Sequence, residues 1–229
     1  MPSDIGLWEA TFALIFGLDP GFVDIAALSL SVSLSAVLLA AVVALPAGAL
    51  LALVRFPGRQ LVITLANTLM GLPPVVIGLV LYLMLSHSGP LGWLRLLYSP
   101  GAMVLAQAVL VTPIILALTR QIIEALHEDY GEQLRSLGAG RRVMVLTLLY
   151  EGRVSLLTAV LAGFARASAE VGAVMIVGGN IAGYTRVMTT TIAMEVGKGE
   201  LPMALALGIV LMTLAFVVNA TLSLLALPR

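Results

Sequence analysis

Apolar residues gather in five long stretches along the chain, and short segments that carry most of the charge separate them. The stretches cover residues 25–54, 61–85, 102–118, 154–177 and 203–227. A helix needs about 20 apolar residues to cross a bilayer, and a longer stretch such as the first must tilt or protrude. A spanning strand would show about 10 residues of strict apolar–polar alternation, which none of the stretches has. The pattern predicts an all-α polytopic membrane protein with about five transmembrane helices.

Composition supports this prediction and narrows the chemistry. The 229 residues are 60% hydrophobic and 10% charged, with a formal net charge of zero, whereas a soluble domain carries about 25% charged residues. Nothing in this balance favours nucleic acid as a partner. The absence of cysteine excludes thiolate metal sites, disulfides and a cysteine nucleophile. His87 and His127 lie far apart and form no metal-binding motif, so we expect neither a metal nor another cofactor.

The first 20 residues form a separate N-terminal segment. Residues 7–16 are apolar but too short to span, and Trp8 and Phe12 stand at helical spacing. Such a segment is typical of a helix that lies along the membrane surface; a sixth, irregular span is the alternative. The first 54 residues contain no Lys or Arg, so the charged start of a signal peptide is missing and we expect the first stretch to be retained.

The positions of Lys and Arg predict the orientation, because cytoplasmic loops carry an excess of positive charge. With the loop after the third stretch inside the cell, eight arginines face the cytoplasm: Arg55, Arg59, Arg120, Arg135, Arg141, Arg142, Arg153 and Arg229. Arg95, Arg186 and Lys198 then lie outside. We therefore expect the N-terminus outside and the C-terminus in the cytoplasm.

Prolines interrupt several of the apolar stretches. Pro46, Pro73, Pro74 and Pro113 fall inside them, and each removes a backbone donor and bends its helix. Membrane bundles tolerate such bends because neighbouring groups satisfy the freed carbonyls. Each proline is either a structural bend or a hinge that lines a cavity, and the Pro73-Pro74 pair is the strongest hinge candidate.

A polar stretch over residues 124–153 separates the third and fourth apolar stretches. It is too long for a simple connector, and apolar residues recur along it at helical spacing: Leu134, Leu137, Val145, Leu148 and Leu149. Gly138-Ala139-Gly140 interrupts it, which predicts two short helices that meet at a bend. Such an element with basic flanks at Arg141 and Arg142 suits docking into the groove of a partner, or contact with anionic lipid; a solvated loop is the alternative.

The segment from Glu132 to Gly138 resembles the EAA motif of ABC importer permeases. That motif has a Glu-Ala-Ala triplet, three residues and a glycine, then nine residues and Ile-x-Leu-Pro. Glu132, Gly138 and the spacing to Leu148 match, whereas the two alanines and the Leu-Pro pair are replaced. The resemblance implies the type I importer fold over a single permease domain, residues 1–229. It also implies that Glu132, Arg135, Gly138, Ala139, Arg141 and Arg142 couple the chain to its ATPase.

Other segments are similar to permeases for sulfate, molybdate and tungstate. The segment 72–79, Leu-Pro-Pro-Val-Val-Ile-Gly-Leu, resembles their second span, and residues 165–172 with 178–181 resemble their fourth span and the loop after it. Residues 171–175 and 179–186 are most similar to the tungstate permeases, although tungstate and molybdate have nearly the same size and charge.

The resemblance implies how such a chain works. Two permease chains in the inner membrane of a prokaryote form the pathway, two cytoplasmic ATPase subunits drive it, and an extracytoplasmic binding protein delivers the oxyanion. This chain has no Gly-x-x-x-x-Gly-Lys-Ser/Thr phosphate loop, so we expect no enzyme activity of its own. ATP-driven closure of the two ATPases would move the coupling helices and open the pathway outward, by alternating access.

Arg166 and Glu170 are the ionisable residues deepest in an apolar stretch. Their spacing of four puts them on one face of a continuous helix, and insertion into a bilayer costs about 3 kcal/mol for either charge alone. They form either a structural ion pair or a way-station for the anion. Gly178-Gly179-Asn180 follows, where the glycines favour a helix end and Asn180 is a gate candidate.

Two other classes of function compete with an ABC permease. An ion-coupled secondary transporter needs an intramembrane acidic site or inverted repeats, and this chain has one intramembrane acid and no clear repeat. An intramembrane protease needs a Ser/His or paired-Asp arrangement within the spans, which the sequence lacks.

Overall fold

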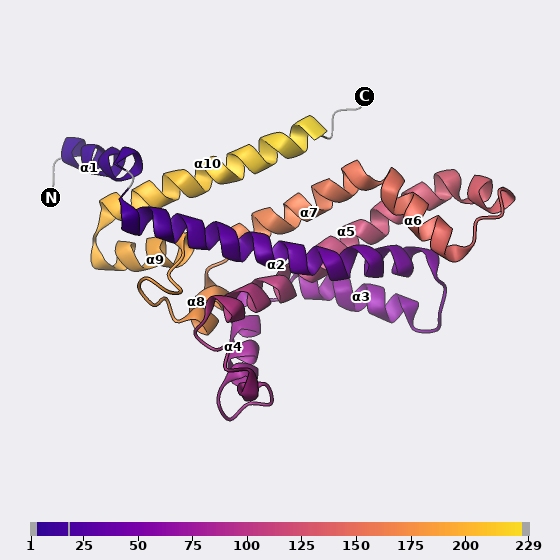
Figure 1. Ribbon diagram of the computed structural model, residues 1–229, viewed down its shortest axis with the longest axis horizontal. Helices are drawn as coiled ribbons and strands as arrows, with labels where there is room; N and C mark the ends of the chain where they lie inside the picture. The colour runs from indigo at the N-terminus through magenta and orange to yellow at the C-terminus, as the bar shows by residue number, and fades with distance from the viewer. Residues whose placement is uncertain (1–3, 18, 226–229) are drawn as a thin grey trace. The chain divides into compact units, whose positions relative to one another are not determined.

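The computed structural model describes residues 4–17 and 19–225, and its regular elements there are all helices (Figure 1). They are α1 (Asp4–Phe16), α2 (Pro20–Leu53), α3 (Arg59–Met70), α4 (Pro74–Leu85), the 3₁₀ turn η1 (Gly92–Leu94), α5 (Pro100–Ser136), α6 (Arg141–Glu151), α7 (Arg153–Ser168), α8 (Gly172–Gly178), α9 (Met188–Lys198) and α10 (Leu201–Leu225). The all-α prediction is confirmed. Residues 226 and 227, the end of the fifth predicted span, lie outside the described residues.

Three of these helices are long and apolar enough to cross a membrane: α2, α5 and α10. Two further pairs, α3 with α4 and α6 with α7, reach the required length only when each interrupted pair counts as one span. The chain therefore has between three and five spans by length and composition, a range that includes the predicted five.

Two predicted spans are interrupted. The stretch 61–85 is divided because α3 ends at Met70 and α4 begins at Pro74, the first residue of its helix. At that position proline loses no helical hydrogen bond, so the Pro73-Pro74 pair starts a new helix instead of bending a continuous one. Likewise the stretch 154–177 is divided between α7 and α8. Pro46 and Pro113 do lie inside α2 and α5, as predicted.

The helices fold into two compact units. The first unit contains the chain up to Ala36 together with Pro73–Gln107 and Ser168–Asn219. The second unit contains Val37–Leu72, Ala108–Ala167 and the chain from Ala220. Both units contain part of α2 and part of α5, and the single permease domain over residues 1–229 stays a prediction.

In the first unit, an apolar core joins α2, α9 and α10 through Phe22, Met188, Ala206 and Leu207. The hydroxyl of Ser29 accepts a hydrogen bond of 2.7 Å from the backbone N–H of Met188, which satisfies a buried donor at the start of α9.

The N-terminal helix α1 also belongs to the first unit and has an exposed aromatic face. Trp8, Phe12 and Phe16 are exposed, and successive ring centroids lie 6.2 Å apart. Such a face suits the interface of a membrane. The surface position of this segment, rather than a sixth span, stays a prediction.

In the second unit, α2 and α7 both pack closely against α5. A Cβ atom at Gly48 would lie 2.8 Å from the carbonyl oxygen of Leu116, and one at Gly163 would lie 2.8 Å from Cδ1 of Ile115. Small residues permit such close approach, which is how membrane helices gain packing energy without a hydrophobic driving force. Farther along α5, Ile123 packs against Met144 and Leu148 of α6, where the predicted coupling segment lies.

Candidate functional site

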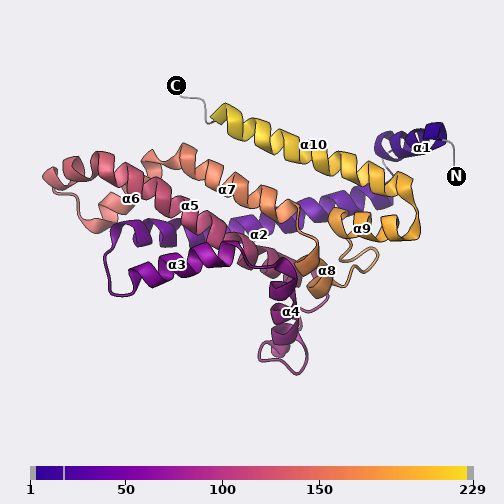
Figure 2. The same cartoon turned by 180° about the vertical axis from the view of Figure 1, so that it is seen from behind.

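The coupling segment is a helical elbow formed by the end of α5, a turn at Gly138 and α6 (Figures 1 and 2). The first helix of the elbow is not the short separate helix predicted from the sequence, because it is the last part of the 37-residue helix α5. At its end Ala139 N–H donates to Leu134 C=O at 3.0 Å and Gly138 N–H donates to Arg135 C=O at 2.9 Å. This is the Schellman arrangement.

Gly138 makes this turn possible. Its φ is +75°, a left-handed conformation that costs other residues about 1–2 kcal/mol. A Cβ atom at this position would meet nothing within 4 Å, so the requirement for glycine is conformational and not steric. The sequence prediction of a bend at this glycine is confirmed.

The inner face of the elbow packs into the core of the second unit. Met144 and Leu148 of α6 are buried against Ala49, Ile123 and Leu156. Four of the five residues that suggested an apolar docking stripe belong to this packed face: Leu134, Val145, Leu148 and Leu149. Only Leu137 of that set is exposed, at 76%, so the stripe predicted from the sequence is mainly a packing face.

The outer face of α6 carries a different apolar stripe. Val143, Leu146 and Tyr150, at spacings of three and four, are 56%, 68% and 68% exposed. The helix turns away from α7 by 72°. Arg153 places its guanidinium carbon 4.4 Å from the centre of the Tyr150 ring. We define Leu137, Val143, Leu146 and Tyr150 as the elbow stripe; its spacing was visible in the sequence, but nothing there distinguished it from the packed face.

Ion pairs support the elbow from α3 and α5. Glu124 contacts both Arg59 and Arg120, and Arg59 Nε donates to the carbonyl of Leu51 at 2.8 Å. One carboxylate therefore joins α5 to the end of α2 through the guanidinium of Arg59. These side chains are partly exposed, which limits such pairs to about 1 kcal/mol.

The charged residues predicted for coupling lie around the turn. Glu132, Arg135, Arg141 and Arg142 are exposed and Ala139 is half-buried. Arg135 donates to Nε2 of His127 at 3.0 Å, which fixes the arginine on the surface of α5. The elbow thus combines an exposed apolar stripe with positive and negative side chains, a combination typical of a docking surface.

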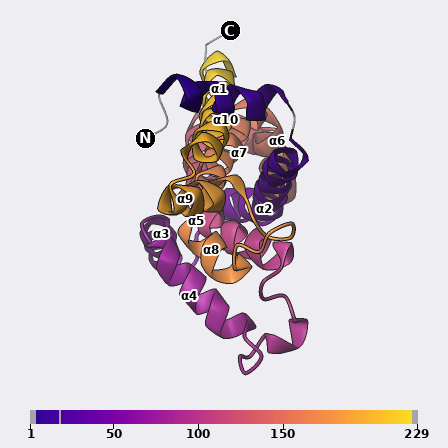
Figure 3. The same cartoon turned by 90° about the vertical axis from the view of Figure 1, so that its left-hand side faces the viewer.

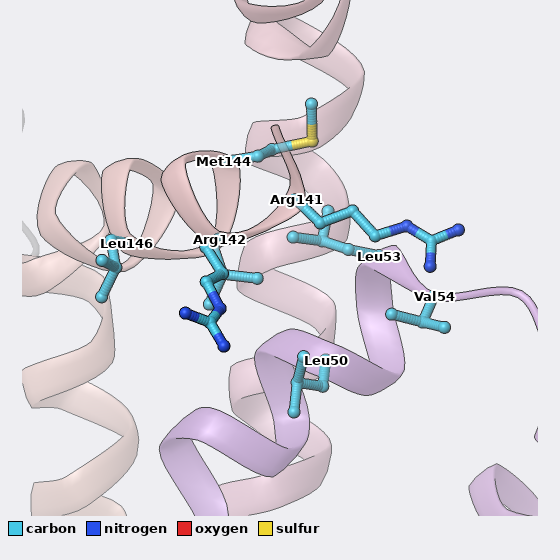
Figure 4. Close-up of a pocket in the computed structure, with 8 residues that line it drawn as sticks. Leu50, Leu53, Val54, Arg141, Arg142, Met144 and Leu146 are labelled. Atoms are coloured by element: carbon cyan, nitrogen blue, oxygen red, sulfur yellow. The ribbon is translucent and has the colours of Figure 1, made fainter. Parts of the chain in front are cut away.

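A cavity of about 350 Å³ opens between the last turn of α2 and α6 (Figure 4). Its lining is apolar except for two arginines: Leu50, Leu53, Val54, Arg141, Arg142, Met144, Val145 and Leu146. A neighbouring cavity of about 610 Å³ has a charged lining: Ala52, Leu53, Arg55, Arg59, Glu124, His127, Glu128, Arg135 and Arg141.

A second candidate site lies in the first unit, where α4 packs on α8 (Figure 3). A Cβ atom at Gly78 would lie 2.7 Å from Cα of Ala173, and one at Gly172 would lie 2.8 Å from Cγ2 of Val75. The two segments that resembled the oxyanion permeases therefore meet in the structure. Pro73 and Pro74 lie at the end of α4 that makes these contacts.

Arg166 and Glu170 do not share one helix, because α7 ends at Ser168. The prediction that they lie on one continuous helical face is wrong. Glu170 is buried at 4% exposure, and its Oε1 accepts from Ala173 N–H at 3.1 Å. Its backbone carbonyl accepts from the hydroxyl of Thr189 at 2.8 Å, so Glu170 joins α8 to α9.

The loop after α8 is held by threonines. Gly179 and Asn180 both have positive φ, at 72° and 49°, so the predicted helix end at these residues is confirmed. Thr190 donates to Oδ1 of Asn180 at 2.9 Å, and Thr185 donates to the carbonyl of Gly178 at 2.6 Å. These hydrogen bonds hold the turn in its left-handed conformation, which glycine and asparagine adopt readily.

The loop before α5 also touches this turn. Tyr98 N–H donates to the carbonyl of Val177 at 2.8 Å, and the phenol of Tyr98 lies 3.5 Å from that of Tyr82. The hydrogen bond with Tyr82, followed by burial and the charge of that neighbour, raises the pKa of Tyr98 above its ordinary value of 10.0. Tyr98 is therefore neutral at physiological pH. Among the described residues, no group of three metal-ligating side chains is found.

The sequence of this chain is similar to those of known transport proteins. The family described as binding-protein-dependent transport system inner membrane component matches residues 44–226. The tungstate uptake system permease protein TupB of Peptoclostridium acidaminophilum is 41% identical over 215 residues, 94% of each chain. That of Campylobacter jejuni is 38% identical over 165 residues, 72% of this chain and 69% of its own. The sulfate transport system permease protein CysT of Escherichia coli is 31% identical over 69% of this chain and 60% of its own.

Proposed function

This chain belongs to the family of inner-membrane components of binding-protein-dependent transport systems, and from that membership we propose that it is the permease subunit of an ATP-driven tungstate importer. The observation that carries the proposal is the 41% identity to a tungstate permease over 94% of both chains. A membrane component of a transport system is not itself an enzyme, as expected from the sequence. ATP hydrolysis then falls to a separate subunit.

Tungstate is favoured over sulfate by the pattern of similarity. The two tungstate relatives are 41% and 38% identical to this chain, whereas the sulfate permease of Escherichia coli is 31% identical. Molybdate stays an alternative cargo, because its size and charge are close to those of tungstate.

The elbow is the proposed contact with the ATPase. Its exposed stripe presents Leu137, Leu146 and Tyr150 away from the core, which suits a helix that enters a groove on a partner. Glu132, Arg135, Gly138, Ala139, Arg141 and Arg142 surround this stripe or form the turn, and these are the residues to which we assign coupling.

The packing of the elbow suits transmission of force. Met144 and Leu148 are buried against α2, α5 and α7, and a Cβ atom at Gly152 would lie 2.8 Å from Cδ1 of Leu126. A close-packed interior transmits strain. Movement of the elbow stripe by the ATPase would therefore move the spanning helices of the second unit, as alternating access requires.

We assign the pathway and its gate to residues of the first unit and to the end of α7. Pro73 and Pro74 start α4 after a helix break, and Glu170 joins α8 to α9. Asn180 has a positive φ, and its side chain accepts a hydrogen bond from Thr190. Arg166 supplies a half-buried positive charge near the end of α7. We assign these residues to the pathway or its gate, and not to a tight binding site, because tight binding would slow release.

Two copies of the chain, each with its N-terminus outside and its C-terminus in the cytoplasm, would complete the pathway. The orientation follows from the clustering of arginines around the elbow.

The absence of cysteine permits a direct test of this orientation with single-cysteine variants at Arg142 and Lys198. A membrane-impermeant maleimide added to intact cells should label the variant at Lys198 but not the one at Arg142; the reverse pattern would overturn the orientation.

Transport itself is tested in proteoliposomes that contain the permease, its ATPase and its binding protein. We expect uptake of tungstate that requires hydrolysable ATP and persists when ion gradients are collapsed. Uptake without nucleotide that follows an ion gradient would favour a secondary transporter. Competition by molybdate and sulfate then establishes the cargo, and stronger competition by sulfate than by unlabelled tungstate would refute the tungstate assignment.

A further inference from the structure

Two adjoining cavities in the second unit differ sharply in chemistry. The apolar cavity of about 350 Å³ and the charged cavity of about 610 Å³ share Leu53 and Arg141 in their linings. Figure 4 shows the Arg142 side chain directed from α6 toward Leu50 of α2, whereas the guanidinium of Arg141 points outward on the side of Val54. A ligand that fills both cavities needs an apolar part next to a charged part.

The charge of this region favours an anion. The charged cavity is lined by four arginines and two glutamates, and these six side chains together carry two net positive charges. Glu124 already contacts Arg59. In the described part of the chain, no hydrogen bond or ion pair is found for the guanidinium groups of Arg55, Arg141 and Arg142. These three groups are available to an external anion.

The position of the two cavities along α2 indicates that they lie near the surface of the membrane. α2 is one of the helices long and apolar enough to cross the membrane, and both cavities lie at its C-terminal end, where Leu53 is followed by the loop that contains Arg55. Because α2 has 34 residues and about 20 suffice to cross the hydrocarbon core, its C-terminal end lies in the head-group layer or just beyond it. The apolar cavity suits the acyl chain of a phospholipid, and the arginines beside it suit the phosphate of the head group.

We propose that this pair of cavities binds an anionic phospholipid. The first part of its acyl chain lies along Leu50, Val54 and Leu146, and its phosphate contacts Arg141 and Arg142. The inference rests on the insertion of α2 in the membrane and not on the coupling role of the elbow. It differs from that role in its ligand, although Leu146, Arg141 and Arg142 belong both to the elbow and to the cavity lining.

The test uses the complete importer purified in detergent and measured by native mass spectrometry. Phosphatidylglycerol and phosphatidylcholine with identical acyl chains are added at equal concentration. Because each arginine near the membrane surface contributes about fivefold to binding of an anionic lipid, two arginines should make retention of the anionic lipid exceed that of the zwitterionic lipid by roughly 25-fold. The Arg141→Glu/Arg142→Glu double variant should abolish this preference.

Two matched variants separate charge from packing. Arg153→Glu makes one such Arg-to-Glu replacement at an exposed position that lines neither cavity, and it should keep the preference. Leu50→Asn, at a half-exposed lining position, should weaken retention of both lipids equally. Transport is measured separately, so that loss of lipid binding and failure of the proposed transport function are distinguishable.

Several results would overturn the proposal. Equal retention of the two lipids by the unmodified importer is one, and this result does not depend on whether any variant folds. Displacement of the lipid by inorganic phosphate alone would assign the arginines to a free anion. Lipid bound to the isolated permease but excluded from the complete importer would assign the cavities to the ATPase interface.

Discussion

Replacement of Gly138 gives the sharpest test of the elbow. Its φ of +75° costs a residue with a side chain about 1–2 kcal/mol, and no neighbour lies within 4 Å of the added Cβ atom. The whole penalty is therefore conformational. If the ATPase recognises only the bent elbow, the apparent affinity of the ATPase for the permease falls in proportion to the population of that conformation. For Gly138→Ala this penalty lowers the affinity by about five- to thirtyfold. Asparagine tolerates positive φ, so Gly138→Asn should lose less.

The chain offers a matched control two residues away. Gly140 has an ordinary extended backbone, with φ of −69° and ψ of 166°, and open space around its Cβ position. Gly140→Ala should therefore bind the ATPase like the unmodified chain. Binding is measured with permease in lipid nanodiscs and purified ATPase, together with nucleotide hydrolysis stimulated by the binding protein. Size-exclusion chromatography confirms that each variant is inserted and folded.

The reasoning fails under either of two outcomes. One is that Gly138→Val binds the ATPase and supports uptake as well as Gly140→Ala does. The other is that Gly138→Ala and Gly140→Ala lose affinity to the same extent, since this would make loss of glycine itself, and not the positive φ, the cause.

Three further predictions concern packing and charge. Gly78→Ala places a methyl group 2.7 Å from Cα of Ala173 and should destabilise the protein by about 1–3 kcal/mol, measured by thermal unfolding in detergent. Gly197→Ala, in open space on α9, is the control. Equal unfolding midpoints for the two variants would contradict the α4–α8 contact. Glu124→Gln should cost about 1 kcal/mol at low salt and less at high salt; a cost that does not change with salt would argue against the ion pairs. Glu170→Ala should be less stable than Glu170→Gln by about 1–3 kcal/mol, because only the amide keeps an acceptor for the Ala173 N–H; equal stability would show that this hydrogen bond contributes nothing.

Predictions from the sequence were correct where one residue type determines the backbone conformation. Gly138 and the Gly178-Gly179 pair were predicted as turn positions, and Gly138 and Gly179 have positive φ. Predictions for the prolines were less reliable, because proline bends a helix when it lies inside the helix but not when it is the first residue. Pro74 is the first residue of α4, a position that the apolar run 61–85 does not reveal.

The sequence by itself determined that the chain is a helical membrane protein, where its apolar stretches lie and that an elbow follows the third of them, because apolar length and glycine conformation are properties of short segments. Only the tertiary structure decided which face of α6 is buried. Both faces of this helix are apolar, with Met144 and Leu148 on one and Leu146 and Tyr150 on the other. The spacing of apolar residues cannot show which of two apolar faces is buried. In the structure, packing against Ile123 of α5 buries the face with Met144 and Leu148 and leaves the face with Leu146 and Tyr150 exposed to a partner.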